Sequence, residues 1–330
     1  MKNAADLKQE NKAQIRGLLR SGASYTKQQI ARRTGLSVAS CNTYLNEMEA
    51  AGEVTGEKQK LHDVGRNAMV YKLNEEYESI LCVYFELIRG VKSIAAAVLS
   101  PLGNLRQKQV RQCDVPDAAV VEGTVARALG DFPNVSCIVV GTPSIAEKGI
   151  IRHSDIEELE NLPLKARLEE RFGLPVLLAN DMHYKVYGYC RQERVDDEIV
   201  TLVNYPSGVL PGTATVHKGV LLTGKNLFAG MVGFLDYGMS RQRQIEQLQR
   251  PTAEPFIVRA AVSLISILNP HRLLFTGDLL GEQEMERVRA ACGSYIPEEY
   301  MPRFVFLPDT DGYYLKGMYW AAVDGKENGK

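Results

Sequence analysis

The stretch KQQIARRTGLSVASCNTYLNEM, residues 27–48, has the pattern of two short helices joined by a tight turn. Gly35 stands at the turn, where a residue with a Cβ would be sterically disfavoured, and the apolar Leu36 follows it. Ser37 is a favourable N-cap for the second helix. In that helix, apolar residues at helical spacing predict one buried face: Cys41, Tyr44, Leu45 and Met48. The pattern predicts a helix-turn-helix whose second helix runs over about residues 37–51.

The opposite face of the second helix carries small or polar side chains: Val38, Ala39, Ser40, Asn42, Thr43 and Asn46. Such groups can contact base edges and phosphates without placing a carboxylate against DNA. The residues that we expect to face duplex DNA are Ser37, Ser40, Asn42, Thr43 and Asn46. A helical hairpin in another kind of domain is the alternative. The offsets of Ala31, Gly35 and Leu36 favour the DNA-binding interpretation.

A two-stranded ribbon is expected directly after these helices. Residues 54–56 can pair with residues 69–73, and the connection between them contains Gly65. This arrangement predicts a winged helix with Arg66 placed to reach a groove or a phosphate, the alternative being a solvated loop residue. Residues 1–73 contain twelve basic and seven acidic side chains, a net charge of plus five. A local positive charge of this kind is what phosphate contact requires.

The composition excludes several other classes of protein. The chain has 330 residues, 45% of them hydrophobic, which is enough for two or three domains with a large core. Its formal net charge is −1, so bulk charge does not favour polyanion binding. The six cysteines are scattered without a CxxC pair, which argues against a disulfide framework or a zinc site. No apolar run approaches the roughly 20 residues that span a bilayer, and the polar N-terminus does not resemble a signal peptide. We therefore expect a cytoplasmic protein with no membrane partner.

The pattern changes after a short charged connector at residues 74–78. Strands then alternate with helices, and the continuous apolar run at residues 135–140 is typical of a strand buried on both faces. A second buried strand at residues 174–178 is followed by the polar pair Asn180 and Asp181. The second half of the chain repeats this plan and closes with a helix of small residues at 313–323. This alternation predicts two α/β lobes with mixed or parallel sheets.

In this order and spacing, several segments resemble the ROK family of repressors and sugar kinases. They are RRTGLSVASCNTYLNEMEAAGEV, VGTPSIAEKGII, LPLKARLEERFGLPVLLAND, LLTGKNLFAGMVGF and LNPHRLLFTGD. The resemblance implies an α/β fold with an N-terminal winged helix-turn-helix and two actin/hexokinase-like (ribonuclease H-like) lobes. It divides the chain into a DNA-binding domain at residues 1–74, a first lobe at 79–190 and a second lobe at 191–330.

The sequence departs from the family's kinases at both phosphate-binding turns. The resemblance implies an Asp and a Gly-Gly-Thr turn in the first lobe, where this chain has Glu86, Leu87, Ile88 and Arg89. Bulky side chains there would fill the space that a nucleotide phosphate needs. The second turn, SGVLPGTA, keeps Gly208 and Gly212 but contains Pro211, which has no N–H to donate. We therefore expect no kinase activity and no cofactor.

The zinc site that the resemblance implies is also missing. Phe234 stands at the position expected for its His, and residues 237–255 contain no Cys. Zinc prefers four nitrogen and sulfur ligands, so no metal is expected here. Met231 likewise stands where the resemblance implies a sugar-binding Glu.

Asn180 and Asp181 match the residues that bind and deprotonate the sugar in family kinases. They are expected to line a ligand site, and the equally weighted alternative is that they only cap the helix that follows. His183, two residues further on, is a weaker candidate for the same cleft. Asp155 is another, although a solvated residue in the acidic run DIEELE is the favoured account.

These features predict a sequence-specific transcriptional regulator, a repressor acting as a homodimer on two operator half-sites. A sugar or sugar-phosphate effector in the interlobe cleft would change DNA affinity by linkage. One alternative is an active ROK sugar kinase with a DNA-binding head. Another is that the two lobes bind no small molecule and serve only for dimerisation and partner contacts.

Overall fold

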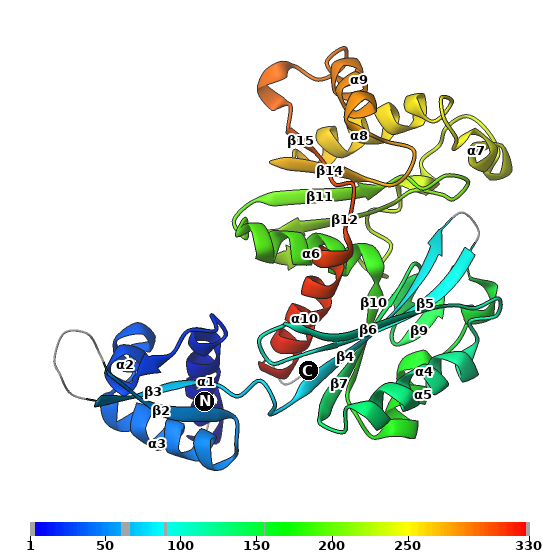
Figure 1. Ribbon diagram of the computed structural model, residues 1–330. Coiled ribbons are helices and arrows are strands. Elements are labelled where there is room, and N and C mark those ends of the chain that lie inside the picture. The colour runs from blue at the N-terminus through cyan, green and yellow to red at the C-terminus, as the bar shows by residue number, and fades with distance from the viewer. Residues whose placement is uncertain (1–3, 61–66, 89–90, 155, 328–330) are drawn as a thin grey trace.

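The computed structural model describes residues 4–60, 67–88, 91–154 and 156–327. The chain forms a small N-terminal head and two larger α/β lobes (Figure 1). The first lobe stands between the head and the second lobe. No helix in this described part of the chain combines the length and the apolar character needed to cross a membrane.

The head is a three-helix unit with a small sheet. Its elements are α1 (Ala4–Leu19), β1 (Tyr25–Thr26), α2 (Lys27–Thr34), α3 (Val38–Ala50), β2 (Val54–Lys60) and β3 (Asn67–Leu73). The sheet order is β1-β3-β2, and the predicted ribbon is confirmed because Val54 pairs with Leu73 in an antiparallel register. The three helices bury one shared core, in which Ile15, Ile30 and Leu45 have no exposed surface.

The first lobe is built on a five-stranded mixed sheet in the order β10-β7-β4-β5-β6. Its strands are β4 (Ser79–Ile88), β5 (Val91–Leu99), β6 (Leu105–Gln112), β7 (Val135–Thr142) and β10 (Val176–Asn180), and its helices are α4 (Ala118–Asp131), η1 (Glu157–Leu159) and α5 (Leu164–Phe172). A separate hairpin, β8 (Ile145–Glu147) with β9 (Ile150–Arg152), follows β7. The strand β4 is antiparallel to β5 and parallel to β7.

The second lobe repeats this topology, as predicted, in the order β13-β12-β11-β14-β15. Its strands are β11 (Ile199–Asn204), β12 (Gly212–His217), β13 (Val220–Leu221), β14 (Arg272–Thr276) and β15 (Arg303–Phe306). Its helices are η2 (Val232–Phe234), α7 (Arg241–Gln247), α8 (Glu254–Leu268), α9 (Glu282–Cys292) and η3 (Glu298–Tyr300). The central strand β11 is antiparallel to β12 and parallel to β14, as β4 is to its two neighbours.

Two further helices, α6 (Asp181–Glu193) and α10 (Asp311–Glu327), lie between the lobes and are exchanged between them (Figure 1). The helix α6 follows the first lobe's β10, yet its buried side chains pack on strands of the second lobe. The helix α10 follows the second lobe's β15, yet Tyr314 and Met318 pack on β4 and β5 of the first lobe. The sequence interpretation places residues 311–327 with the second lobe. Periodicity shows that one face of a helix is buried but not which sheet covers it.

The two exchanged helices cross at a pair of glycines. A Cβ on Gly317 would lie 2.6 Å from the carbonyl carbon of Tyr184, and a Cβ on Gly188 would lie 2.6 Å from the backbone nitrogen of Gly317. Carbon atoms in contact normally stand about 3.5–4.0 Å apart, so neither position has room for a side chain. The glycines therefore allow backbone-to-backbone packing of the helices that connect the two lobes.

Candidate DNA-binding head and interlobe cavity

Local capping interactions shape the helix-turn-helix. Thr26 and Gln29 form a reciprocal capping box at the start of α2, with hydrogen bonds of 3.2 and 2.8 Å. Gly35 ends α2 with a φ of 74°, a left-handed conformation that glycine adopts without strain. The Ser37 hydroxyl accepts the backbone N–H of Ser40 at 3.0 Å and caps α3. The predicted turn at Gly35 and cap at Ser37 are therefore confirmed.

The residues expected to face DNA share one side of α3, but several of their polar groups are already used. The hydroxyls of Ser37 and Ser40 are 2.9 Å apart and hydrogen-bonded to each other. The Thr43 hydroxyl donates to the carbonyl oxygen of Ala39. Four of these side chains are exposed and Ser40 is half-buried; the exposed ones are Ser37, Asn42, Thr43 and Asn46. Their contact with DNA remains a prediction, and Arg66 lies outside the described residues.

Lys27 joins this surface although sequence reasoning did not select it. Its Nζ donates to Oδ1 of Asn42 at 2.5 Å and lies 5.4 Å from the centre of the Tyr71 ring. The first residue of α2 thus meets the second turn of α3, which no local spacing predicts. Val38, at the first turn of α3, adds an apolar group that is 50% exposed.

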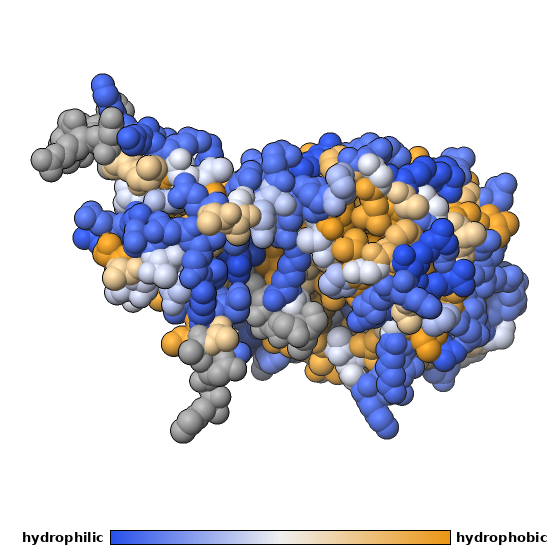
Figure 2. All heavy atoms as spheres, turned by 90° about the horizontal axis from the view of Figure 1, so that it is seen from below, coloured by the Kyte–Doolittle hydropathy of each residue, from blue (hydrophilic) through white to orange (hydrophobic). Residues whose placement is uncertain are grey.

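One acidic side chain of α3 lies away from this surface and is paired with two lysines. Glu47, on the other side of α3, pairs with Lys12 at 2.9 Å and Lys8 at 2.8 Å. Hydrogen bonds from these two lysines lower the pKa of the Glu47 carboxyl. Exposed basic side chains occupy α2 and the ribbon strand β2: Arg32, Arg33, Lys58 and Lys60. Hydrophilic side chains predominate over the face of the head seen in Figure 2.

The body contains a cavity of about 640 Å³ that both lobes line. Asn180 and Asp181 lie in its wall, where β10 ends and α6 begins. The Asn180 side chain accepts the backbone N–H of Met182 at 2.9 Å and donates to the carbonyl oxygen of Ser144 at 3.1 Å. Asn180 therefore caps α6 and lines the cavity at the same time, so its two interpretations are compatible.

Asp181 is held by a lysine one helical turn away. The Nζ of Lys185 lies 2.6 Å from Oδ2 of Asp181, and both side chains are largely buried. The same ammonium stands 5.1 Å from the centre of the Tyr314 ring of α10. A carboxylate paired in this way is less available to remove a proton from a ligand hydroxyl.

His183 does not line the cavity. It is 6% exposed, and burial lowers the pKa of its imidazole, partly offset by the nearby Asp181 carboxylate. The structure therefore separates His183 from Asn180 and Asp181, while His153 and Ser154 of the first lobe do lie in the wall. Asp155 lies outside the described residues.

The second phosphate turn offers few free backbone donors. The N–H of Ser207 donates to the Asp278 carboxylate at 2.6 Å, and the N–H of Gly208 donates to the carbonyl oxygen of Leu248 at 2.9 Å. Pro206 and Pro211, which also line the cavity, have no N–H. The predicted filling of the first phosphate turn by the side chains of residues 86–89 lies outside what the structure describes.

Charges in the cavity wall are unfavourable for an anion. The described lining has four carboxylates and two basic side chains: Asp181, Asp278, Asp309 and Asp311 against Lys185 and Arg241. Lys185 is committed to Asp181, and the Arg241 guanidinium lies 3.8 Å from the centre of the Phe234 ring. A phosphorylated ligand would therefore meet net negative charge.

The residues at the zinc position do not fit that metal. Phe234 is an apolar ring that contacts Phe228 at a centroid distance of 4.9 Å. Within the described residues, no group of three or more His, Cys, Asp and Glu side chains is arranged to hold a metal ion. Met231 lies in the cavity wall, where its thioether cannot replace a sugar-binding carboxylate.

Two known family models match separate parts of the chain. A winged helix-turn-helix DNA-binding model matches residues 15–55, and a ROK family model matches residues 88–245. The chain carries a ROK domain behind a winged helix-turn-helix head. No curated protein sequence matches the chain.

Solved structures share the fold of this chain at low sequence identity. One is a ROK family transcriptional regulator described as a homologue of the E. coli MLC protein, with a TM-score of 0.71, 14% identity and coverage of 98% of both chains. A ROK hexokinase from Thermus thermophilus has a TM-score of 0.58 and 19% identity, and covers 75% of this chain and 100% of its own. A ROK family protein from Streptococcus pneumoniae in complex with sucrose has a TM-score of 0.61 and 14% identity. The match covers 76% of this chain and 99% of that protein. The predicted fold, a winged head on sugar-kinase-like lobes, is confirmed.

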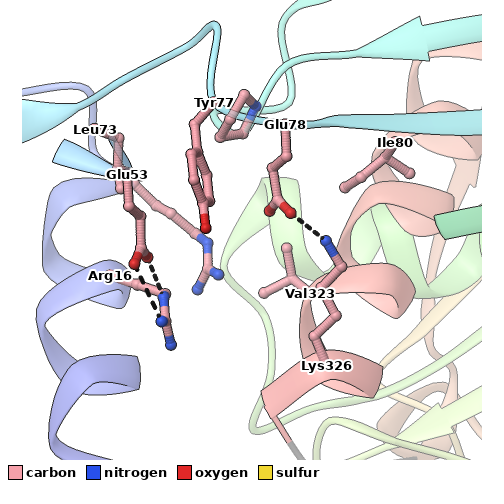
Figure 3. A pocket seen from close by; sticks show the side chains of 10 residues that line it. Arg16, Glu53, Leu73, Tyr77, Glu78, Ile80, Val323 and Lys326 are labelled. Atoms are coloured by element: carbon pink, nitrogen blue, oxygen red, sulfur yellow. Dashed lines mark hydrogen bonds and ion pairs between the residues drawn. The ribbon is translucent and has the colours of Figure 1, made fainter. Parts of the chain in front are cut away.

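Two ion pairs flank the joint between head and first lobe, one within the head and one between the connector and α10 (Figure 3). Arg16 of α1 pairs with Glu53, and Lys326 of α10 pairs with Glu78 at 2.7 Å. Tyr77 lies between these two pairs in Figure 3, and burial together with the Glu53 and Glu78 charges raises the pKa of its phenol. The connector is therefore packed against the body and does not act as a loose tether.

The connector is also hydrogen-bonded to the first lobe. Glu75 accepts hydrogen bonds from the Ser100 hydroxyl at 3.0 Å and the Asn104 amide at 2.9 Å. Leu102, from the same turn, packs against the core of the head. These contacts place the head and the first lobe in one packed unit.

Proposed function

We propose that this ROK chain is a sequence-specific transcriptional repressor that binds operator DNA as a homodimer and transfers no phosphoryl group. The observation that carries the proposal is the complete winged helix-turn-helix head, in which α3 exposes polar side chains and basic side chains lie on either side of it. Two heads on one dimer would match two operator half-sites. The likeness to a solved ROK transcriptional regulator along nearly the whole chain supports the same assignment.

The wall of the cavity argues against the alternative of an active kinase. Phosphoryl transfer depends on positioned donors and cations around the transferred group. In this chain the Ser207 N–H is taken by Asp278, and Asp181 is tied to Lys185. Incubation of the pure protein with Mg-ATP and a panel of hexoses should give no sugar phosphate. Hexose-dependent turnover that disappears in Asp181→Ala would support the kinase instead.

An unphosphorylated sugar is the effector class that the cavity favours. The space of about 640 Å³ suits a small ligand, and carboxylate and amide groups can bind sugar hydroxyls. The net negative wall disfavours a sugar phosphate. Thermal-shift screening should give a higher melting temperature with the neutral sugar than with its phosphate, since a bound ligand stabilises only the folded state. The absence of a shift with every sugar would favour a body that acts only in dimerisation.

The helix α10 offers a route from this cavity to the head. Asp311, at its start, lines the cavity and pairs with Lys108 of β6. Val323 and Lys326, near its end, line the joint with the head. A helix of 17 residues spans roughly 25 Å, so one rigid element touches both places. Ligand-dependent movement of the second lobe would act on α10 through the segment that joins it to β15.

DNA binding itself is tested with the full-length chain and a pool of duplexes that contain a random core. Repeated selection should enrich a paired half-site sequence, and footprinting should then show protection of both halves. A failure to enrich any sequence would overturn the proposed function. Sedimentation of the protein alone and on the selected duplex would test the dimer.

A further inference from the structure

The side chain of Lys27 is held from two sides next to Asn42 of the predicted DNA-facing surface. Its Nζ lies 2.5 Å from Oδ1 of Asn42 on α3 and 5.4 Å from the centre of the Tyr71 ring of β3. Tyr71 is only 3% exposed, so its ring is a rigid support for the ammonium group. Three elements of the head therefore hold Lys27 and Asn42 together before any DNA is bound.

This contact decides which groups Asn42 presents. A lysine ammonium only donates hydrogen bonds, so the oxygen of the Asn42 amide must face it. The NH₂ group of Asn42 is left as the outward-facing part of an exposed side chain. An asparagine that reads adenine needs both its oxygen and its nitrogen for the N6 and N7 positions. With its oxygen directed at Lys27, Asn42 presents its NH₂ donors outward.

The polar groups near this pair already make hydrogen bonds within the head. The hydroxyls of Ser37 and Ser40 are bonded to each other, and the Thr43 hydroxyl donates to a backbone carbonyl of its own helix. The Glu49 carboxylate accepts the backbone N–H of Gly56 at 3.2 Å. The surface around Lys27 and Asn42 is thus rich in donors, because the ammonium also keeps N–H groups beyond the one used by Asn42.

We propose that Lys27 and Asn42 act as one donor pair that reads a guanine in each operator half-site. In the major groove guanine presents two acceptors, N7 and O6, whereas adenine and cytosine present a donor and thymine one acceptor beside a methyl group. Two donors held side by side match guanine alone. This inference rests on the proposed DNA-binding function and adds the base that the head selects.

The experiment uses the full-length chain and the duplexes enriched from the random pool. One guanine common to the half-sites is replaced by 7-deazaguanine, which lacks the N7 acceptor but keeps the pairing edge. Wild-type affinity should fall about tenfold. In Asn42→Ala and in Lys27→Met, which keeps an apolar stem of similar length, native and 7-deaza duplexes should bind almost equally. Asn46→Ala is the matched control on the same helix face, and it should keep the full difference.

Several outcomes would overturn the inference while leaving the proposed function standing. One is an enriched half-site without a shared guanine. Another is a 7-deaza penalty that persists in Asn42→Ala. A third is that Lys27→Met weakens both duplexes equally and reduces the salt dependence by about one charge, which is the behaviour of a phosphate contact. A pool that yields no enriched sequence would refute the DNA-binding function itself. Circular dichroism of each variant separates these results from misfolding.

Discussion

Gly317→Ala should destabilise the protein even though alanine is the better helix former. In an unpacked helix, replacing glycine by alanine stabilises by about 1 kcal/mol. At Gly317 the new Cβ would overlap the carbonyl oxygen of Tyr184 and lie 2.6 Å from its carbonyl carbon, so α6 and α10 would have to separate by more than about 1 Å. Both partners at this point are backbone, which cannot rotate away as a side chain can. Overpacking of this kind costs about 3 kcal/mol, which leaves a net loss of about 2 kcal/mol.

The single tryptophan makes this prediction measurable at the crossing itself. Trp320 lies on α10, where its ring contacts Tyr319 and the Arg191 guanidinium of α6. Thermal unfolding followed by Trp320 fluorescence should shift down by about 5 °C or more in Gly317→Ala. Gly123→Ala is the matched control, because Gly123 lies inside α4 with nothing within 4 Å of its added Cβ. That variant should be as stable as the wild type or slightly more stable. A Gly317→Ala protein that unfolds at or above the wild-type temperature would refute the close crossing.

Three further predictions concern the head, the joint and the second lobe. Val38→Ala should weaken operator binding about fourfold if Val38 packs on a thymine methyl, and uracil at that thymine should abolish the difference between variant and wild type in a gel-shift titration. Lys326→Glu places a carboxylate beside Glu78, and native-state proteolysis within the connector should become about threefold faster; an unchanged rate would mean that the pair does not fasten the joint. The hydrogen bond from Arg272 lowers the pKa of the Glu198 carboxyl, so its stabilising effect is present above the ordinary glutamate pKa and is lost as the pH falls through the lower, folded-state value. Glu198→Gln should therefore unfold at a lower temperature than wild type at pH 7, with a difference that shrinks in acid; a constant difference from pH 7 to pH 3 would contradict this account.

The cavity lies between two sugar-kinase-like lobes. Residues at its phosphate turn and zinc position make contacts within the protein. Asp278 holds the second phosphate turn from within, and Phe234 occupies the zinc position with an aromatic contact to Arg241. Neither change prevents the two lobes from enclosing a neutral ligand.

The sequence by itself determined the local structure of this protein. Helix caps, the glycine turn and apolar periodicity act between residues a few positions apart, so Ser37, Gly35 and the buried face of α3 could be predicted. The repeated strand and helix order predicted two similar lobes. The absence of the phosphate-turn glycines and zinc ligands that the family resemblance implies could also be read directly from the sequence.

Only the tertiary structure decided how distant segments meet. The pairing of Lys27 with Asn42 and the exchange of α6 and α10 between the lobes join residues far apart in the sequence, and no local spacing encodes them. The tertiary structure also decided the place of His183. Its side chain is buried away from the cavity, although Asp181, two residues earlier, lines it. Successive residues of a helix point in directions about 100° apart, so proximity in sequence does not place side chains in one site. Packing selected which of the candidate polar residues face the cavity and which groups remain available to read DNA.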